Sequence, residues 1–338
     1  MTPEEKKALL PYSSGRLAEV IVVTDSKSLD SSFKEDIKRV FHKRIKGHPP
    51  PGEPMFKVLF TDESFFKGYF KNHHNIFILL HENRANRLKE IIGEVTVDRM
   101  VNRLKTEPQT FGVKQEDVYA QNQSIFWVLA SNKEAMQQKL LDYDEELLQL
   151  AYKHETHSAK FKLIGDISVK RDRFYQKSIK TRGFGVRKPK AYKVAIDNDE
   201  FVWLRKSSTT QELEQGLLLY EAPYRTKEDL STDSLIKFRN RLVKKYIPGE
   251  LKGSYMKYST MMPPVRTDEN FKGKYGVEIR GWWDVEGDFM GGPSYIKAVV
   301  DEANGRIVFA EGFLFFPNEE KAVHLRELEV LVNTLSIK

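Results

Sequence analysis

Residues 277–286 alternate between two kinds of side chain, and this pattern constrains the fold more than any other in the chain. Five apolar or small residues interleave with five larger or charged ones, namely Val277, Ile279, Gly281, Trp283 and Val285 with Glu278, Arg280, Trp282, Asp284 and Glu286. Successive side chains of a β-strand point to opposite faces of the sheet. The pattern therefore predicts an antiparallel strand with one buried and one more polar face, which places Trp283 in the core.

The sequence after this strand predicts a three-stranded meander covered by a helix. Residues 294–301 and 306–316 are two further strand-like runs, and Asn304-Gly305 between them is a strong hairpin signal. Asn318 is expected to cap the C-terminal helix, with Glu319 and Glu320 in its first turn. The buried stripe of that helix is expected at Leu325, Leu328, Val332 and Leu335.

Gly291-Gly292-Pro293 lies between the first two strands of this meander, directly after Met290. Glycines inside a strand pattern are typical of bulges and bends, so we expect one at this point. Met290 is expected to fill space at the strand junction.

The polar face of the first strand provides candidate ligand-binding residues. Trp282, Asp284 and Glu286 are expected on one strand face, with Asp288 in the adjacent turn. Aromatic rings beside acids are a familiar arrangement for holding sugars. The alternative is structural, in which a helix packs on this face and covers Trp282.

The rest of the chain predicts more strands and helices. Strands are expected at 17–24, 55–61, 75–80, 125–130, 192–197, 200–206 and 216–220. Helices are expected at 31–46, 97–105 and 232–246, and a longer one is expected after a cap at Ser131 or Asn132, running past His157 and interrupted at Gly165.

These elements predict an α+β fold with antiparallel or mixed sheets covered by helices. We place an N-terminal α/β lobe at 1–158 and a C-terminal α+β lobe at 159–338, with a basic linker helix at 159–193; one compact unit is the alternative. The short apolar runs 76–80 and 216–220 resemble each other. A further alternative is therefore that the chain consists of two similar lobes produced by duplication.

The net charge of +7 is concentrated in one segment. The segment from Lys160 to Lys193 contains twelve lysines and arginines but only two acidic residues. Such a segment attracts nucleic acid or another polyanion, or it is a solvated surface whose charges pair with acids elsewhere. The candidate polyanion-binding residues are Lys170, Arg171, Arg173, Lys177, Lys180, Arg182, Arg187, Lys188 and Lys190.

Motifs for catalysis, cofactors and metals are not found in the sequence. It contains no G-x-S-x-G elbow, no phosphate-binding loop, no G-x-G-x-x-G after a strand and no cysteine. His73-His74 would point to opposite sides of an extended chain, and His154-x-x-His157 lacks the spacing of a zinc-protease motif. We therefore predict no catalytic residue, no metal and no cofactor.

A set of weak landmarks in a fixed order resembles one known family. The landmarks are Ser13-Ser14-Gly15-Arg16, Gly216-Leu217-Leu218-Leu219-Tyr220, Trp283 with Met290-Gly291-Gly292-Pro293, Glu311-Gly312-Phe313 and Leu325-Arg326-Glu327-Leu328-Glu329. Between about residues 13 and 335 their order and spacing are similar to those of DUF4837, a family of unknown function found mainly in Bacteroidetes. The resemblance implies no activity. It implies a lipoprotein anchored through an N-terminal cysteine, which this sequence lacks, as in a mature or trimmed chain.

Three functions stay open. The resemblance implies a non-enzymatic lipoprotein of the cell envelope that binds or scaffolds an envelope protein or polymer, touching the membrane only through its lipid anchor. The first alternative is a nucleic-acid or polyanion binder that uses the basic segment, and the second is a hydrolase of envelope glycans. A native gene without a signal peptide would place the protein in the cytoplasm instead. The oligomeric state is open.

Overall fold

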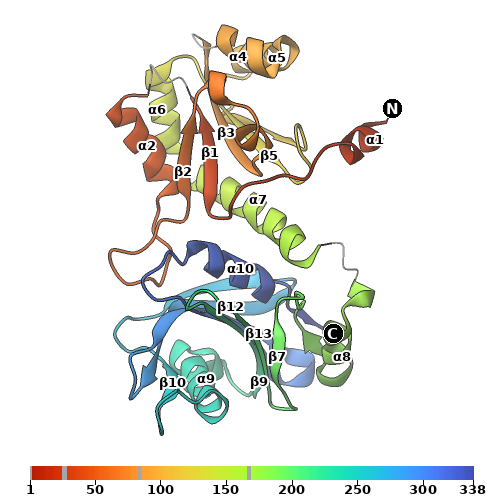
Figure 1. Cartoon of the computed structure of the whole chain (residues 1–338), viewed down its shortest axis with the longest axis vertical. Coiled ribbons are helices and arrows are strands. Elements are labelled where there is room, and N and C mark those ends of the chain that lie inside the picture. The colour runs from red at the N-terminus through yellow and green to blue at the C-terminus, as the bar shows by residue number, and fades with distance from the viewer. Residues whose placement is uncertain (1, 25–28, 83–84, 166–168) are drawn as a thin grey trace. The chain divides into compact units, whose positions relative to one another are not determined.

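A mixed sheet of five strands and an antiparallel sheet of eight strands organise the chain (Figure 1). The computed structural model describes residues 2–24, 29–82, 85–165 and 169–338. These residues divide into two units. Unit 1 comprises residues 1–43 and 54–159, and unit 2 comprises residues 44–53 and 160–338.

The sheet of unit 1 has the strand order β2-β1-β3-β5-β4, in which only β4 runs antiparallel to its neighbour. Its strands are β1 (Glu19–Val23), β2 (Lys57–Thr61), β3 (Asn75–His81), β4 (Gly112–Glu116) and β5 (Ser124–Ala130). Every residue of β1, β3 and β5 is buried. Parallel strands are near-continuous apolar runs when helices cover both faces of their sheet.

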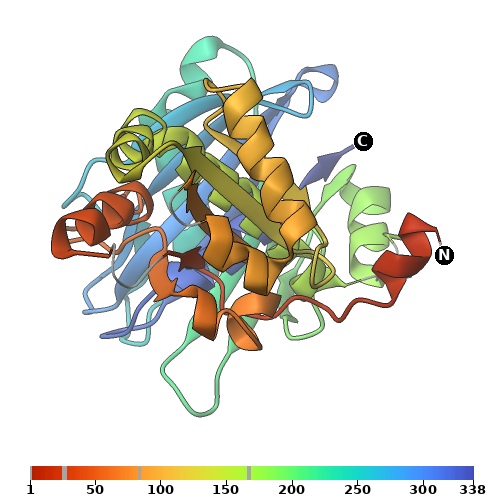
Figure 2. The same cartoon turned by 90° about the horizontal axis from the view of Figure 1, so that it is seen from above.

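The helices of unit 1 form a layer on each face of this sheet (Figure 2). One face packs against α2 (Ser31–Phe41), α6 (Lys133–Asp142) and the first half of α7 (Asp144–Ile164). The other face packs against α4 (Ala85–Ile92) and α5 (Glu94–Thr106). Two short helices, α1 (Pro3–Ala8) and α3 (Tyr69–Asn72), complete the unit together with the 3-10 turn η1 (Glu63–Phe65).

The sheet of unit 2 has the order β10-β12-β13-β14-β9-β8-β7, and β11 also pairs with β12. Its strands are β7 (Lys193–Asp197), β8 (Phe201–Ser207), β9 (Glu214–Pro223), β10 (Tyr255–Tyr258), β11 (Val265–Phe271), β12 (Lys274–Glu286), β13 (Gly291–Asp301) and β14 (Arg306–Phe315). The meander β12-β13-β14 confirms the prediction for the last quarter of the chain.

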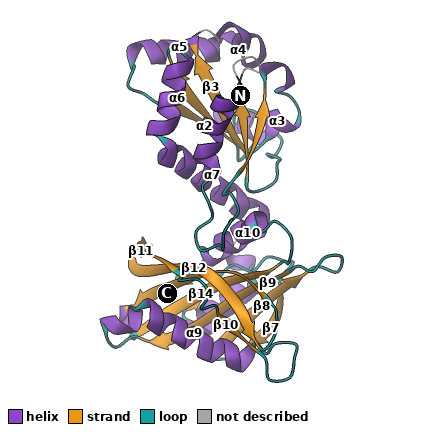
Figure 3. Ribbon diagram, turned by 90° about the vertical axis from the view of Figure 1, so that its left-hand side faces the viewer, coloured by secondary structure: helices purple, strands orange, loops and turns teal. Residues whose placement is uncertain are grey.

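Two helices cover opposite faces of this antiparallel sheet (Figure 3). Helix α9 (Thr232–Tyr246) packs on the face that carries Trp283 and Phe309, and α10 (Ala322–Val332) packs on the other. The unit also contains α8 (Arg173–Arg182), the 3-10 turns η3 (Val169–Arg171), η4 (Lys227–Leu230) and η5 (Glu302–Asn304), and a small pairing of β6 (Phe184–Gly185) with β15 (Ser336–Ile337).

Several predicted boundaries are wrong, each for a local reason. The helix expected at 31–46 ends at Phe41, and residues 44–53 belong to unit 2. The helix expected after Asn132 is two helices, separated at Tyr143. The Asn304-Gly305 turn is not a two-residue hairpin, because η5 precedes a left-handed Gly305.

The start of the C-terminal helix also differs from the prediction. Asn318 does not cap it, and Glu319 and Glu320 precede the helix, which begins at Ala322. The cap comes instead from Glu53, whose Oε2 accepts the backbone N–H groups of Lys321 at 2.7 Å and Ala322 at 2.9 Å. A side chain distant in sequence thus satisfies backbone donors that a local residue normally serves.

The α+β class is confirmed, with helices on mixed and antiparallel sheets. The two units do not share a topology, however, because the strands of unit 1 are mainly parallel and those of unit 2 are antiparallel. The likeness between residues 76–80 and 216–220 therefore does not extend to the arrangement of the strands. Both are central apolar strands, which explains their similar composition.

Candidate functional site

A pocket of about 250 Å³ opens on the α9 face of the sheet in unit 2, just beyond the C-terminal end of that helix. Strands β8, β12 and β14 and the segment after α9 line it, mainly with apolar groups. Its largest lining side chains are Trp203, Trp283, Phe313, Phe315, Met256 and Met290. We call this the aromatic pocket.

The aromatic rings of this pocket contact one another in a fixed arrangement. The Phe313 ring meets Trp283 edge-on, with 5.6 Å between centroids, and lies 6.4 Å from Trp203. The ring centroid of Phe315 lies 6.4 Å from that of Trp283. Aromatic pairs in such edge-to-face and tilted geometries are favourable beyond simple burial, so the wall is formed without a ligand.

Two glycines allow the rings to take these positions. Gly216 pairs with Phe313 across β9 and β14, and a Cβ at Gly216 would lie 1.9 Å from Phe313 Cε1. Gly292 pairs with Trp283, and its Cβ would lie 1.9 Å from the carbonyl oxygen of Leu314. A bend or bulge was predicted at Gly291-Gly292-Pro293, and the bulge is wrong, since the ladder between β12 and β13 is continuous there. Close approach of neighbouring groups explains these glycines instead.

The two indole N–H groups of the pocket differ in their hydrogen bonding. Trp283 Nε1 donates to the carbonyl of Leu314 at 3.2 Å. Trp203 Nε1 is buried but has no hydrogen-bond partner among the described residues. A buried donor without a partner costs about 1–3 kcal/mol.

Charged groups lie only at the rim of the aromatic pocket. Arg205 and Glu214 form an ion pair at 2.5 Å, and the guanidinium of Arg205 lies 5.8 Å from the ring centroid of Trp203. Glu250 is exposed and adds a second carboxylate. The interior of the pocket is therefore apolar and its opening is polar, as is usual for ligand pockets.

The ligand-binding candidates from the sequence lie elsewhere. Trp282 and Asp284 are half-buried on the α10 side of β12, and Glu286 is exposed at its end. Lys257 forms an ion pair with Glu286 and lies 4.0 Å from Asp284. Asp288 accepts the N–H of Phe289 within the turn. The four residues lie close in sequence, and their role in binding stays a prediction.

Residues 44–53 lie on this second face of β12. His48 meets the ring of Trp282 edge-on, with 6.0 Å between centroids, and Gly47 lies against the backbone of Arg280. Burial lowers the pKa of His48 to about 4. Trp282 is thus partly covered by the loop of residues 44–53.

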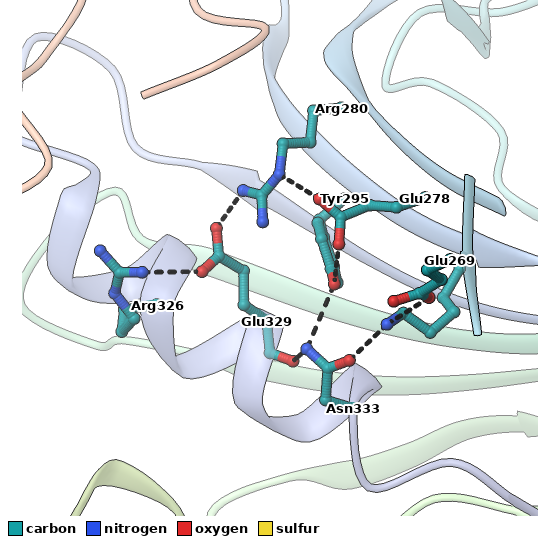
Figure 4. A network of polar contacts seen from close by, with 8 residues as sticks. Glu269, Glu278, Arg280, Tyr295, Arg326, Glu329 and Asn333 are labelled. Atoms are coloured by element: carbon teal, nitrogen blue, oxygen red, sulfur yellow. Dashed lines mark hydrogen bonds and ion pairs between the residues drawn. The ribbon is translucent and has the colours of Figure 1, made fainter. Parts of the chain in front are cut away.

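A polar network connects this face to α10 (Figure 4). Arg280 bridges Glu278 of its own strand and Glu329 of the helix, and Glu329 also accepts from Arg326 at 3.2 Å. On β13, Tyr295 donates to Glu278 at 2.8 Å, and Lys297 donates to Asn333 at 2.6 Å and pairs with Glu269 at 2.6 Å. The network fixes the helix on the sheet, so it has a structural role.

A second ionic contact lies on the opposite face, beneath α9. Arg239 and Glu311 are fully buried and pair at 2.7 Å, and the hydroxyl groups of Tyr220 and Ser294 also donate to Glu311. Burial alone would lower the pKa of Arg239, but the adjoining carboxylate raises it above its ordinary value. Arg239 therefore remains charged inside the protein.

The basic candidates are divided between exposed and paired side chains. Arg187 pairs with Asp172 at 3.0 Å, Arg182 pairs with Asp197, and Lys188 donates to the carbonyl of Tyr192. Lys177 is exposed but pairs with Asp197. The remaining candidates are exposed, namely Lys170, Arg171, Arg173, Lys180 and Lys190. Whether these residues bind a polyanion stays a prediction.

Unit 1 buries a histidine cluster at the amino ends of its parallel strands. The rings of His73 and His74 stack with 4.4 Å between centroids, so the expectation that they point apart is wrong. Glu19 lies 4.0 Å from His73, and Glu155 lies 3.7 Å from His74. His154 lies in the same cluster, and burial, with the nearby His74, lowers its pKa to about 4. These side chains are closed to solvent and support a structural role.

The structure shows neither a metal cluster nor a membrane-spanning helix in the part of the chain that it describes. No group of three or more His, Asp or Glu side chains there has the geometry to hold a metal ion. No helix in those same ranges is both long enough and apolar enough to cross a bilayer.

The sequence did not point to the aromatic pocket as a site. It predicted Trp283 as a core residue and Met290 as filler, and both are packed against the core as well as lining the pocket. Trp203, Phe313 and Phe315 come from other strands, and their proximity depends on the register of β8, β9 and β14. The available signal for this site was a glycine that pairs with an aromatic residue of the neighbouring strand, as Gly216 pairs with Phe313.

Comparison with known families divides the chain near the same point as the structure. Residues 13–163 match the model of DUF8532, and residues 172–334 match that of DUF4837, both domains of unknown function. A comparison with curated proteins gave no match. The DUF4837 match covers most of unit 2, whereas the landmark at Ser13–Arg16 falls within the DUF8532 match. Residues 172–334 therefore match DUF4837, the family that the sequence landmarks resemble, and the DUF8532 match precedes them.

Proposed function

We propose that this protein is a non-enzymatic binding module of the cell envelope, which holds one apolar or aromatic group of its partner in the aromatic pocket. One observation carries the proposal. Four aromatic rings and two methionines form a pocket that is already open in the free protein. The partner is an envelope protein or polymer that presents such a group.

The size of the pocket suits a single group. An apolar cavity of about 150 Å³ takes up benzene, so a pocket of about 250 Å³ has room for a ring system of naphthalene or indole size. An aromatic side chain that buries about 200 Å² gains about 5 kcal/mol before the costs of association are subtracted. An isolated group of this size should therefore bind weakly, and a larger partner would add further contacts.

The chemistry of the lining supports binding. Inside the rim the pocket offers rings, alkyl groups and thioethers, and its charged members, Arg205 and Glu214, are paired with each other. Thioethers adapt to differently shaped apolar groups. Location in the envelope rests on the family resemblance. Finding the native protein in the cytosolic fraction of its cells would contradict it, and finding it with the membranes would support it.

Titration with N-phenyl-1-naphthylamine tests the pocket, because the fluorescence of this neutral probe increases in apolar surroundings. The intact protein should give a saturable increase, and Trp203→Ala should weaken binding at least about fivefold through loss of one wall. Trp282→Ala is the matched control, since it removes the same ring from the opposite face of the sheet and should leave binding unchanged.

A second variant separates loss of the pocket from loss of the fold. Met290→Glu places a charge in the half-buried lining and should exclude the probe while circular dichroism shows an intact fold. Absence of saturable binding to the intact protein would overturn the proposal. Equal losses in Trp203→Ala and Trp282→Ala would do so as well.

A further inference from the structure

A second pocket of about 270 Å³ lies near the N-terminal end of α9, on the same face of the sheet as the aromatic pocket. Leu235 and Phe238 of the helix line it, together with Ile307 and Phe309 of β14. The aromatic pocket instead lies beyond the C-terminal end of the helix, where Ile247 is one of its lining residues. We call this second site the arginine pocket.

The floor of the arginine pocket is apolar and held in place by stacking. Phe309 is fully buried, and its ring lies 5.9 Å from that of Phe238 and 4.6 Å from that of Tyr220. Leu235 and Ile307 are also buried. A hydrocarbon group placed on this floor would contact rings and methyl groups that are already ordered.

Two arginines, Arg225 and Arg241, lie at the rim of this pocket. The guanidinium groups of Arg225 and Arg241 make neither a hydrogen bond nor an ion pair with any of the described residues. By contrast, Arg239, on the same helix as Arg241, is fully paired with Glu311. The Arg241 guanidinium lies 4.7 Å from the ring centroid of Phe238, which keeps it beside the apolar floor. A planar guanidinium that is free to form hydrogen bonds is well suited to a carboxylate or phosphate.

The charge balance of the lining favours a ligand with one negative charge. Asp229 also lines the pocket, and its Oδ2 already accepts the backbone N–H groups of Arg225 at 2.8 Å and Thr226 at 3.0 Å. Two guanidinium groups and one carboxylate leave one positive charge, to which the N-terminal end of α9 adds positive potential. A phosphate with two negative charges would be left partly uncompensated beside Asp229.

We infer that the arginine pocket binds a small amphipathic carboxylate, with its hydrocarbon part on Leu235, Phe238 and Phe309 and its carboxylate between Arg225 and Arg241. This site is separate from the aromatic pocket and does not depend on the function proposed there. It extends the binding capacity of unit 2 from neutral apolar groups to hydrophobic acids.

Ligand-detected NMR titrations with 4-phenylbutyrate and its uncharged amide, 4-phenylbutyramide, test this inference on the intact protein. The carboxylate should bind about tenfold more tightly than the amide, because only the carboxylate forms charge-assisted hydrogen bonds. Arg225→Gln and Arg241→Gln should each weaken the carboxylate several-fold and reduce its advantage over the amide. Both arginines are exposed, so these variants should fold normally.

Two controls locate the bound probe. Arg173→Gln removes an exposed arginine of unit 2 outside the pocket and should leave the affinity unchanged. Trp203→Ala, which damages the aromatic pocket, should also leave it unchanged. Loss of binding in Trp203→Ala but not in the two arginine variants would overturn the inference, as would equal binding of acid and amide or no binding to the intact protein. Tighter binding of phenyl phosphate than of phenylbutyrate would overturn the assignment to a monoanion.

Discussion

The two units bury polar side chains in different places, and the type of sheet explains the difference. In unit 1 the parallel strands β1, β3 and β5 are covered on both faces, and the histidine cluster lies where these strands begin. In unit 2 the antiparallel strands carry ionic groups along their length, such as Glu311 in β14 and Arg280 in β12. The parallel strands of unit 1 are near-continuous apolar runs that leave little place for a charge. Helices cover both faces of the unit 2 sheet as well, but its strands carry charged residues that pair with α9 or α10.

This comparison also separates two ways of keeping a buried ionisable group stable. Unit 1 keeps the imidazole of His154 uncharged, and burial lowers its pKa. Unit 2 keeps Arg239 charged by pairing it with Glu311. The first arrangement is sensitive to acid, and the second is sensitive to the loss of one partner.

The largest effect is expected when the buried pair of unit 2 is broken. Arg239→Met should lower the free energy of unfolding of unit 2 by about 3–5 kcal/mol, because Glu311 would stay buried without its cation. The double variant Arg239→Met with Glu311→Leu should recover much of this loss. Urea unfolding followed by tryptophan fluorescence reports mainly on unit 2, which contains Trp203, Trp282 and Trp283. A loss below about 1 kcal/mol in the single variant would contradict the account of this pair.

Acidification should destabilise unit 1 through His154. Its pKa is about 4 in the folded protein and 6.5 in the unfolded chain, so the unfolded chain binds the proton first as the pH falls. The stability is complete above pH 6.5 and is lost towards pH 4, with a loss of about 2 kcal/mol at pH 5 from this group.

His154→Gln should flatten this pH dependence, measured as the free energy of unfolding of unit 1 at pH 7.5 and pH 5. The exposed His157 is the matched control, and His157→Gln should leave the slope nearly unchanged. An equally steep loss in His154→Gln would show that another group in unit 1 governs its acid sensitivity.

An intermediate effect is expected at the start of α10. Glu53→Ala should lower the free energy of unfolding of unit 2 by about 1 kcal/mol, because two backbone donors lose their acceptor. Glu53→Gln keeps an acceptor oxygen and should lose less. Glu319→Gln changes the acid that the sequence placed in the first helical turn, and it should have no measurable effect. A larger loss in Glu319→Gln than in Glu53→Ala would restore the cap predicted from the sequence.

The sequence predicted those features whose cause is local. Alternation in residues 277–286 gave the strand and the burial of Trp283, because the period of two follows directly from strand geometry. The cap of α10 could not be predicted in this way, since Glu53 lies 268 residues before Lys321. The aromatic pocket was not predicted from the sequence for a similar reason. Trp203 and Phe313 become neighbours only through two strand pairings, to which the sequence gives no register.

The smallest effect of all is expected at Lys180 in the basic segment, where a free charge can be compared with the paired charge of Arg187. Arg187→Gln should lower the free energy of unfolding by about 1–2 kcal/mol, since its partner Asp172 is buried and would lose its cation. Lys180→Gln removes an exposed charge and should change stability by less than about 0.5 kcal/mol. If the exposed cations attract polyanions, Lys180→Gln should weaken binding to heparin at low salt more than Arg187→Gln does. The reason is that only a free cation is available to a polyanion. Equal stability losses in the two variants would mean that the pairing of Arg187 contributes nothing to the fold of unit 2.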